Sequence, residues 1–351
     1  MNPISRLSSG MNFDLLRYFL PSISLSLFII LILFDYEKSQ LLAKDIERDS
    51  QISAPISLGN LESLTSPPNY HAEDLLPSFI DELPYIVVLR NVVCQSNFTL
   101  SETDDLCQDI YQLQEDLVKY LAIPYSYEKI ELCLFADSKT YIAFIKNHFA
   151  GAPLDRPALY IKDNGPGILM VKKDENMRLN IRHEMTHAFL NSALRNVPIW
   201  LDEGLAKYFE IPAGQRGFEN PFLQKMKNSK INWAFFSTVP SLARLEKLNN
   251  VNQMQEREYR ESWAWIHFLI HYSPQTQRLL VQYLQTLTVE KQKNISLKDA
   301  IKYQQRTPLT RILEKQIPDY KAKFIKHFEI WKINQKEYFE NKREQKRFLN
   351  Q

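Results

Sequence analysis

Residues 181–210 read IRHEMTHAFLNSALRNVPIWLDEGLAKYFE, and this stretch decides how the rest of the chain is interpreted. His183 and His187 stand four positions apart, so on a helix they lie on one face. Two imidazoles on one helical face can hold a single Zn²⁺ ion. Glu184 lies about a hundred degrees further round the same helix. From there its carboxylate can reach a metal-bound water rather than the metal, which is the geometry of a general base.

The surroundings of this H-E-x-x-H motif are apolar. Leu179, Met185, Ala188 and Phe189 form an apolar stripe, which predicts a buried helix. Buried histidine and glutamate side chains need polar partners, and a metal ion would supply them. The alternative is a pair of core histidines whose ring nitrogens are satisfied by backbone carbonyls.

A third metal ligand is predicted at Glu203, sixteen positions after His187. That length of chain completes one helix, turns at 196–198 and brings a second helix back across the first. Pro198 suits the first turn of this second helix. Two histidines, one glutamate and a water give an open catalytic site rather than a closed structural one. Gly204, next to the ligand, allows the two helices to pack closely.

The two motifs, HEMTHAFL and PIWLDEGLAKYFE, resemble those of the gluzincin metallopeptidases, the clan with HExxH and a ligand glutamate. Within that clan the chain is most similar to the peptidase MA-like, DUF1570-like group. The W-L-x-E-G-x-A element also resembles the M1 aminopeptidases, in which that glutamate binds zinc. The resemblance covers roughly residues 84–272. It implies His183, His187 and Glu203 as zinc ligands and Glu184 as the catalytic base.

One more element of the resemblance concerns catalysis, and one position departs from it. The YRESWA stretch from Tyr259 is similar to Y-E-x-G-x-A of M1 enzymes, whose tyrosine donates a hydrogen bond to the tetrahedral intermediate. The alternative is a tyrosine at the start of a core helix. Thermolysin-like enzymes carry an aspartate four residues after the ligand glutamate to orient a ligand histidine, but here that position is Lys207. The orienting group must then be Glu210 or a backbone carbonyl.

The composition is that of a globular protein: 351 residues, 44% hydrophobic and 24% charged, with a formal net charge of +2. Such a balanced charge argues against a nucleic-acid partner. The cysteines, Cys94, Cys107 and Cys133, form no C-x-x-C pair, which argues against a zinc ribbon or thioredoxin-like motif. Either one disulfide forms, with Cys94–Cys107 the first choice by proximity, or all three are buried thiols.

The N-terminal region predicts a membrane anchor. Residues 18–34 are uncharged for seventeen positions, at the lower edge of a bilayer span. Arg6 and Arg17 precede them and Asp35 and Glu37 follow, which places the N-terminal tail, 1–17, in the cytoplasm and the rest outside. A signal anchor is favoured over a cleaved signal because no small-residue cleavage site follows. With the bacterial source that the resemblance suggests, this means a single-pass inner-membrane protein with a periplasmic body.

The rest of the chain predicts an α+β fold. Residues 35–81, rich in charge and then in Ser, Pro and Asn, predict a flexible linker. β-Branched and aromatic runs predict strands at 84–93, 129–136, 160–162 and 168–172, and helical spacing predicts helices at 101–121 and 138–149. By the resemblance, this small mixed sheet precedes the zincin-type active helix, 176–195. Its edge strand, 168–172, either pairs with an extended peptide or is an ordinary edge strand.

The C-terminal half is predicted to be mostly helical. After the ligand helix, 199–210, further helices are expected at 242–248, 256–272, 275–287, 297–304 and 308–315. His267 and His271 form a second pair four apart, interpreted as core or surface residues because no matching base or carboxylate accompanies them. The gluzincin-like metallopeptidase domain therefore spans 82–318, and a C-terminal helix with a basic tail fills 319–351.

These features predict a membrane-anchored zinc peptidase in which Glu184 activates a zinc-bound water. An endopeptidase is slightly favoured, since the chain has no G-x-M-E-N motif to hold a substrate amine. The expected partners are a peptide or protein substrate and the membrane. The alternative is a non-catalytic envelope protein that binds zinc or peptides on the same fold. Substrate preference and oligomeric state do not follow from the sequence.

Overall fold

The computed structural model describes residues 70–71, 75–162, 166–218, 222, 239–287 and 307–349, without the side chains of 332–337, 341–342 and 344–349. Every described residue belongs to one compact unit, which lies within Pro55–Gln351. The predicted anchor, 18–34, and the helix at 297–304 lie outside the described residues. None of the helices in the described ranges has the length and apolarity that a bilayer span needs.

A five-stranded mixed sheet forms the N-terminal half of the described body. Its strands are β1 (Tyr85–Leu89), β2 (Val92–Ser96), β3 (Ile130–Phe135), β4 (Ala158–Ile161) and β5 (Gly167–Lys172), in the order β1-β2-β3-β5-β4. Strands β2, β3 and β5 are parallel, and the outer strands β1 and β4 run antiparallel to their neighbours. The predicted small mixed sheet is therefore confirmed.

Two details of the predicted sheet are wrong. Residues 84–93 form a hairpin of two strands rather than one strand, because the chain reverses at Arg90, which has a left-handed φ of 55°. The strand at 168–172 is not an edge strand. It lies between β3 and β4, because β4 folds back antiparallel onto it. The sheet edge on this side is therefore β4.

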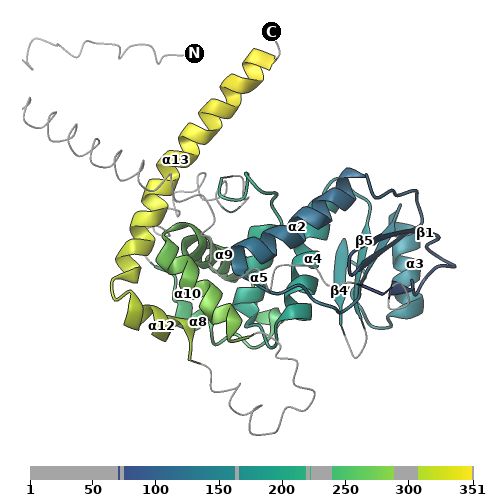
Figure 1. Cartoon of the computed structure of the whole chain (residues 1–351), viewed down its shortest axis with the longest axis horizontal. Coiled ribbons are helices and arrows are strands. Elements are labelled where there is room, and N and C mark those ends of the chain that lie inside the picture. The colour runs from purple at the N-terminus through teal and green to yellow at the C-terminus, as the bar shows by residue number, and fades with distance from the viewer. Residues whose placement is uncertain are drawn as a thin grey trace, which may run out of the picture. The chain divides into compact units, whose positions relative to one another are not determined.

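Helices cover both faces of this sheet (Figure 1). Helix α3 (Ser138–His148) packs on the face that carries Cys133, Phe135 and Met170. Helices α2 (Asp105–Leu121) and α4 (Met177–Ala193) share the core of the opposite face, which carries Leu132 and Leu169. Alternate residues of each strand thus enter different cores, as the pleat requires. All three cysteines are buried free thiols, and no disulfide joins them.

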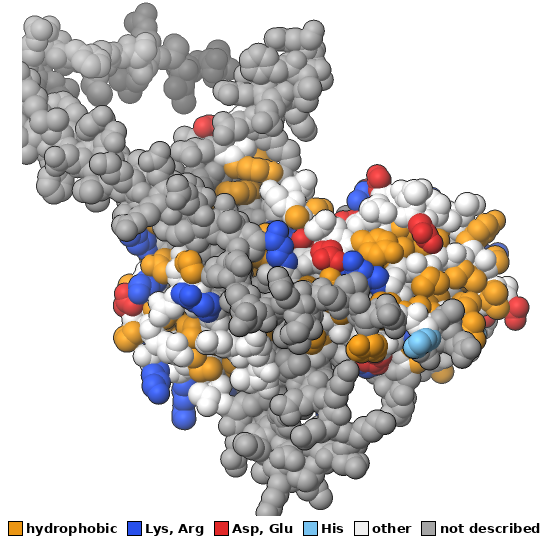
Figure 2. Space-filling model, viewed as in Figure 1, with side chains coloured by type: hydrophobic (Ala, Val, Ile, Leu, Met, Phe, Trp, Pro, Cys, Tyr) orange, Lys and Arg blue, Asp and Glu red, His pale blue; other side chains and the backbone are white. Residues whose placement is uncertain are grey.

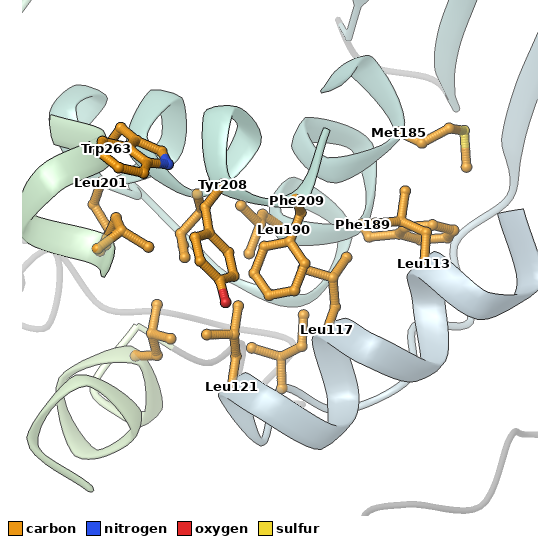
Figure 3. Packing of buried hydrophobic residues seen from close by; sticks show 14 of the residues in the cluster. Leu113, Leu117, Leu121, Met185, Phe189, Leu190, Leu201, Tyr208, Phe209 and Trp263 are labelled. Atoms are coloured by element: carbon orange, nitrogen blue, oxygen red, sulfur yellow. The ribbon is translucent and has the colours of Figure 1, made fainter. Parts of the chain in front are cut away.

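The C-terminal half is helical, as predicted. It contains α5 (Ile199–Phe209), α8 (Leu242–Leu245), the short 3₁₀ helix η4 (Val251–Gln253), α9 (Glu256–His271), α10 (Pro274–Gln285), α12 (Leu309–Gln316) and α13 (Tyr320–Leu349). Figure 3 shows how the two halves join. Leu117 and Leu121 of α2 face Tyr208 and Phe209 of α5, and Phe189 of α4 lies beside them. This shared core fixes α4 and α5 against each other.

The apolar side chains that remain exposed gather at the far edge of the sheet. Among the described residues, four of the seven exposed large hydrophobic side chains belong to β1 or to the segment leading into it: Leu76, Ile80, Tyr85 and Val88. Figure 2 shows hydrophobic side chains concentrated over the half of the body that holds the sheet. Strand β4, beside α4, contributes none of these exposed residues.

Candidate metal centre

The connection between α4 and α5 brings the predicted ligand residues together. Helix α4 ends at Ala193, and the chain turns through Asn196, whose φ of 49° is left-handed. The backbone N–H of Arg195 donates to the carbonyl of Leu287 at 2.7 Å, which ties this turn to the end of α10. Pro198 is the N-cap residue of α5, immediately before its first helical residue, Ile199. The tight helix connection predicted at 196–198 is confirmed.

His183, His187 and Glu203 form a group that could hold a metal ion. The Nε2 atoms of the two histidines lie 3.3 Å apart, and each lies 3.6 Å from Glu203 Oε2. Two ligand atoms bound about 2.0–2.1 Å from a tetrahedral ion are about 3.3–3.4 Å from each other. The three atoms therefore have nearly the mutual spacing of three corners of a zinc coordination tetrahedron.

The polar atoms of this group also have the chemistry of cation ligands. Glu203 Oε2 is buried and has no hydrogen-bond partner. An unsatisfied buried carboxylate oxygen is costly, more so than a neutral polar group. The two facing Nε2 atoms can share only one proton between them, whereas a cation would accept both lone pairs. The residues present thus fit a metal ion with nitrogen and carboxylate ligands.

A carboxylate lies behind each histidine. Glu210 Oε2 is 3.0 Å from His183 Nδ1, and Asp202 Oδ1 is 3.0 Å from His187 Nδ1. The Asp202–His187 pair is within ion-pair distance, but its geometry is not that of a hydrogen bond. A carboxylate at Nδ1 leaves Nε2 free to face a metal. Of the two orienting groups that the sequence left open, Glu210 rather than a backbone carbonyl lies at His183 Nδ1.

Asp202 was not foreseen from the sequence. It directly precedes Glu203, about a hundred degrees round α5. Its residue type could have indicated a role, because a largely buried helix rarely carries two adjacent carboxylates unless both have polar partners.

The carboxylates close to His183 and His187 shift the pKa values of this group. Burial disfavours the charged forms, but the carboxylates of Asp202 and Glu203 raise the pKa of His187 to about 10. The pKa of His183 is also raised, against burial, by Glu203 and Glu210. The same contacts lower the pKa values of Glu203 and Glu210 below those of an ordinary glutamate, again against burial. A divalent cation at the Nε2 atoms would balance the charge of these carboxylates.

The two predicted catalytic residues lie beside this group. Glu184 is half-buried on α4, and no hydrogen bond or ion pair joins it to any described residue. Tyr259 is half-buried in the first turn of α9. Burial, together with the charges of Glu203 and Glu184, raises the pKa of Tyr259 to about 12. The Tyr259 hydroxyl therefore keeps its proton near neutral pH and can act as a hydrogen-bond donor.

Comparison with known proteins agrees with part of the predicted resemblance. Residues 179–292 match a family model described as "Protein of unknown function (DUF1570)". The matched segment, about a third of the chain, contains His183, Glu184, His187, Glu203 and Tyr259. No curated protein matches the chain. The segment that carries the candidate metal centre is thus DUF1570-like, as the motifs predicted.

Proposed function

We propose that this protein is a zinc-dependent peptidase, anchored in the inner membrane by residues 18–34, with its catalytic body in the periplasm. The observation that carries the proposal is the convergence of His183, His187 and Glu203 at tetrahedral spacing, with Glu184 one position after a ligand. Zinc is the ion to expect, since two imidazoles and one carboxylate are the ligands of catalytic zinc in several hydrolases.

The chain's own residues have distinct roles in the proposed reaction. His183, His187 and Glu203 would hold the ion, which when bound supplies Lewis acidity and an activated water. Glu184 takes a proton from the attacking water at its carboxylate and then delivers it to the leaving amine. The Tyr259 hydroxyl donates a hydrogen bond to the developing oxyanion and keeps its proton. Asp202 and Glu210 keep the two imidazoles in the tautomer that presents Nε2.

The substrate is proposed to bind as an extended strand along β4. This strand has a strand neighbour on only one side among the described residues, and it contacts α4. Lys162, just after β4, donates to the carbonyl of Asn191 on α4 at 3.0 Å, which holds the strand alongside the helix. A peptide added to this edge would gain backbone hydrogen bonds next to His183 and His187. An endopeptidase is slightly favoured, because no G-x-M-E-N motif is present to hold a substrate amine.

The test combines metal content with cleavage. Purified full-length protein in detergent should contain close to one zinc per chain by elemental analysis, and His183→Ala and Glu203→Ala should lose it. The zinc-loaded wild type should cleave members of a mixed peptide library, detected by mass spectrometry, whereas Glu184→Gln should keep its zinc and lose cleavage.

Other outcomes separate the alternatives. Zinc in the wild type without cleavage of any library peptide would favour the non-catalytic zinc- or peptide-binding envelope protein. A wild type without zinc, or zinc unchanged in Glu203→Ala, would contradict the ligand assignment itself.

A further inference from the structure

Lys207 stands on α5, one helical turn after Glu203. A lysine cannot accept a proton from a histidine, so it cannot orient a ligand histidine directly. Its Nζ lies 2.9 Å from Glu210 Oε2 and 6.0 Å from the ring centre of Tyr259. Lys207 therefore lies between the carboxylate behind His183 and the predicted oxyanion donor.

A single oxygen of Glu210 joins His183 to Lys207. Oε2 accepts from His183 Nδ1 at 3.0 Å and from Lys207 Nζ at 2.9 Å. The Glu210 side chain is only 4% exposed, so its charge is removed from water. A buried carboxylate that loses its cationic partner is strongly destabilised. The contact with Lys207 therefore helps to hold Glu210 Oε2 at His183 Nδ1.

The backbone on either side of Glu210 is fixed from another direction. Arg182 donates from Nε to the carbonyl of Phe209 at 3.1 Å and from Nη2 to that of Ile211 at 3.5 Å. Arg216 Nε also donates to the Ile211 carbonyl, at 2.8 Å. Figure 3 shows Phe209 pointing into the core between α2 and α4. The backbone at Glu210 is thus held independently of Lys207, which leaves the direction of the carboxylate to Lys207 and His183.

The two ligand histidines differ in this respect. Behind His187, the carboxylate of Asp202 has no lysine or arginine within ion-pair distance among the described residues. It is also 22% exposed, so water can stabilise its charge. Only on the His183 side does a lysine, itself partly exposed, pair with the carboxylate behind the histidine. The loss of Lys207 should therefore disturb one of the two histidines.

We propose that Lys207 is a positioning residue of the metal centre, which holds Glu210 so that His183 presents Nε2 to the ion. This inference rests on the proposed metal site but not on peptidase activity. It also explains how the site functions with a lysine where thermolysin-like enzymes have an aspartate. Here the single orienting acid is replaced by a Lys207–Glu210 pair.

The test measures metal binding in the full-length protein. Zinc dissociation constants are determined by competition with a chromogenic chelator for wild type, Lys207→Met, Lys207→Arg and Glu210→Gln. The matched control is Lys323→Met, which removes another helix-surface lysine that pairs with an acid, Asp319, at 2.8 Å. The absorption spectrum of the Co²⁺-loaded protein reports ligand geometry separately, and thermal melting of the metal-free protein reports stability.

Lys207→Met should weaken zinc binding about 10- to 100-fold, the usual effect of losing a group that supports a ligand. It should also alter the Co²⁺ spectrum, whereas Lys323→Met should change neither. Lys207→Arg, which keeps the charge, should restore most of the affinity. The double variant Lys207→Met/Glu210→Gln should bind no more weakly than the weaker single variant, because both act through the same contact.

Several results would overturn the inference. These are a Lys207→Met affinity within twofold of wild type, an unchanged Co²⁺ spectrum, or fully additive effects in the double variant. If Lys207→Met fails to fold, Lys207→Gln keeps a hydrogen-bond donor without the charge and is judged by the same criteria. A wild type that binds zinc but cleaves nothing would contradict only the peptidase proposal, whereas a wild type without zinc would contradict both.

Discussion

Gly204 of α5 lies directly against Ile266 of α9. A Cβ atom on Gly204 would be 2.9 Å from Ile266 Cγ1, too close without a shift, and 3.0 Å from the Ser262 carbonyl oxygen, a tight contact. Gly204, next to the predicted metal ligand Glu203, was expected to permit close packing of α5 on α4. The structure shows that the close partner is α9, the helix that carries Tyr259.

Gly204→Ala should therefore destabilise the protein by about 1–3 kcal/mol, the range seen when a methyl group is forced into a packed core. It should also weaken zinc binding, because Glu203 would move with the backbone. Chemical denaturation and zinc titration measure the two effects. Ile266→Ala in the same chain should recover part of the loss. An alanine variant as stable as wild type would show that the α5–α9 contact can widen freely.

Zinc affinity should rise with pH because His187 must lose a proton to bind the ion. The pKa of His187 is about 10, above the ordinary value of 6.5. Protonated His187 therefore contributes its full stabilisation of the fold below pH 6.5, and this contribution is lost as the pH rises through 10. Between these limits affinity should increase about tenfold per pH unit for each proton displaced. Titration calorimetry in buffers of different ionisation enthalpy counts those protons.

Asp202→Asn provides the control for this pH dependence. Removal of that carboxylate lowers the pKa of His187, so fewer protons should be released on zinc binding near neutral pH. Equal proton release in wild type and Asp202→Asn would contradict the proposed origin of the effect.

Tyr259→Phe should lower kcat with little change in KM. The hydroxyl is expected to act only on the oxyanion, and loss of one such donor typically costs about 10²–10³-fold. Zinc content should be unchanged, which separates this variant from the ligand variants. A rise in KM at constant kcat would instead assign Tyr259 to substrate binding, and no change in either would leave it as part of the α9 core.

Acid should weaken the packing of α13 on α9. His267 Nδ1 lies 2.9 Å from His327 Nε2, both side chains are buried, and burial holds both pKa values well below 6.5. Both rings are thus neutral in the folded state and gain protons on unfolding. Stability should be full above about pH 6.5 and fall below it by roughly 1.4 kcal/mol per pH unit for each histidine.

Urea denaturation across this pH range measures the slope, and His327→Asn should reduce it. His148→Asn is the control, since His148 is partly exposed and pairs with Glu82 at 2.6 Å. The burial of His267 agrees with the prediction that it is a core residue. An equal slope in wild type and His327→Asn would show that other groups control the acid response.

The errors in the predicted fold have a common physical origin. Residues 84–93 are β-branched on both sides of the Arg90–Asn91 turn, so the composition is continuous where the backbone reverses. The residue with the left-handed backbone is Arg90 and not a glycine, so the sequence shows no turn residue at this position. Strand β5 was predicted to be the edge strand, but the order of strands depends on which of them pair. Strand β4 is too short for its sequence pattern to show that it lies outside β5.

The sequence by itself determined the α+β class, the helix with His183 and His187 on one face, and the return of Glu203 to that face. These features depend on periodicity, a turn and residue type, all of which are local. Only the tertiary structure decided which carboxylate lies behind each histidine, that Lys207 pairs with Glu210, and that Gly204 meets α9. These relationships join side chains whose separation depends on how α4, α5 and α9 pack, and no local pattern encodes a distance between helices.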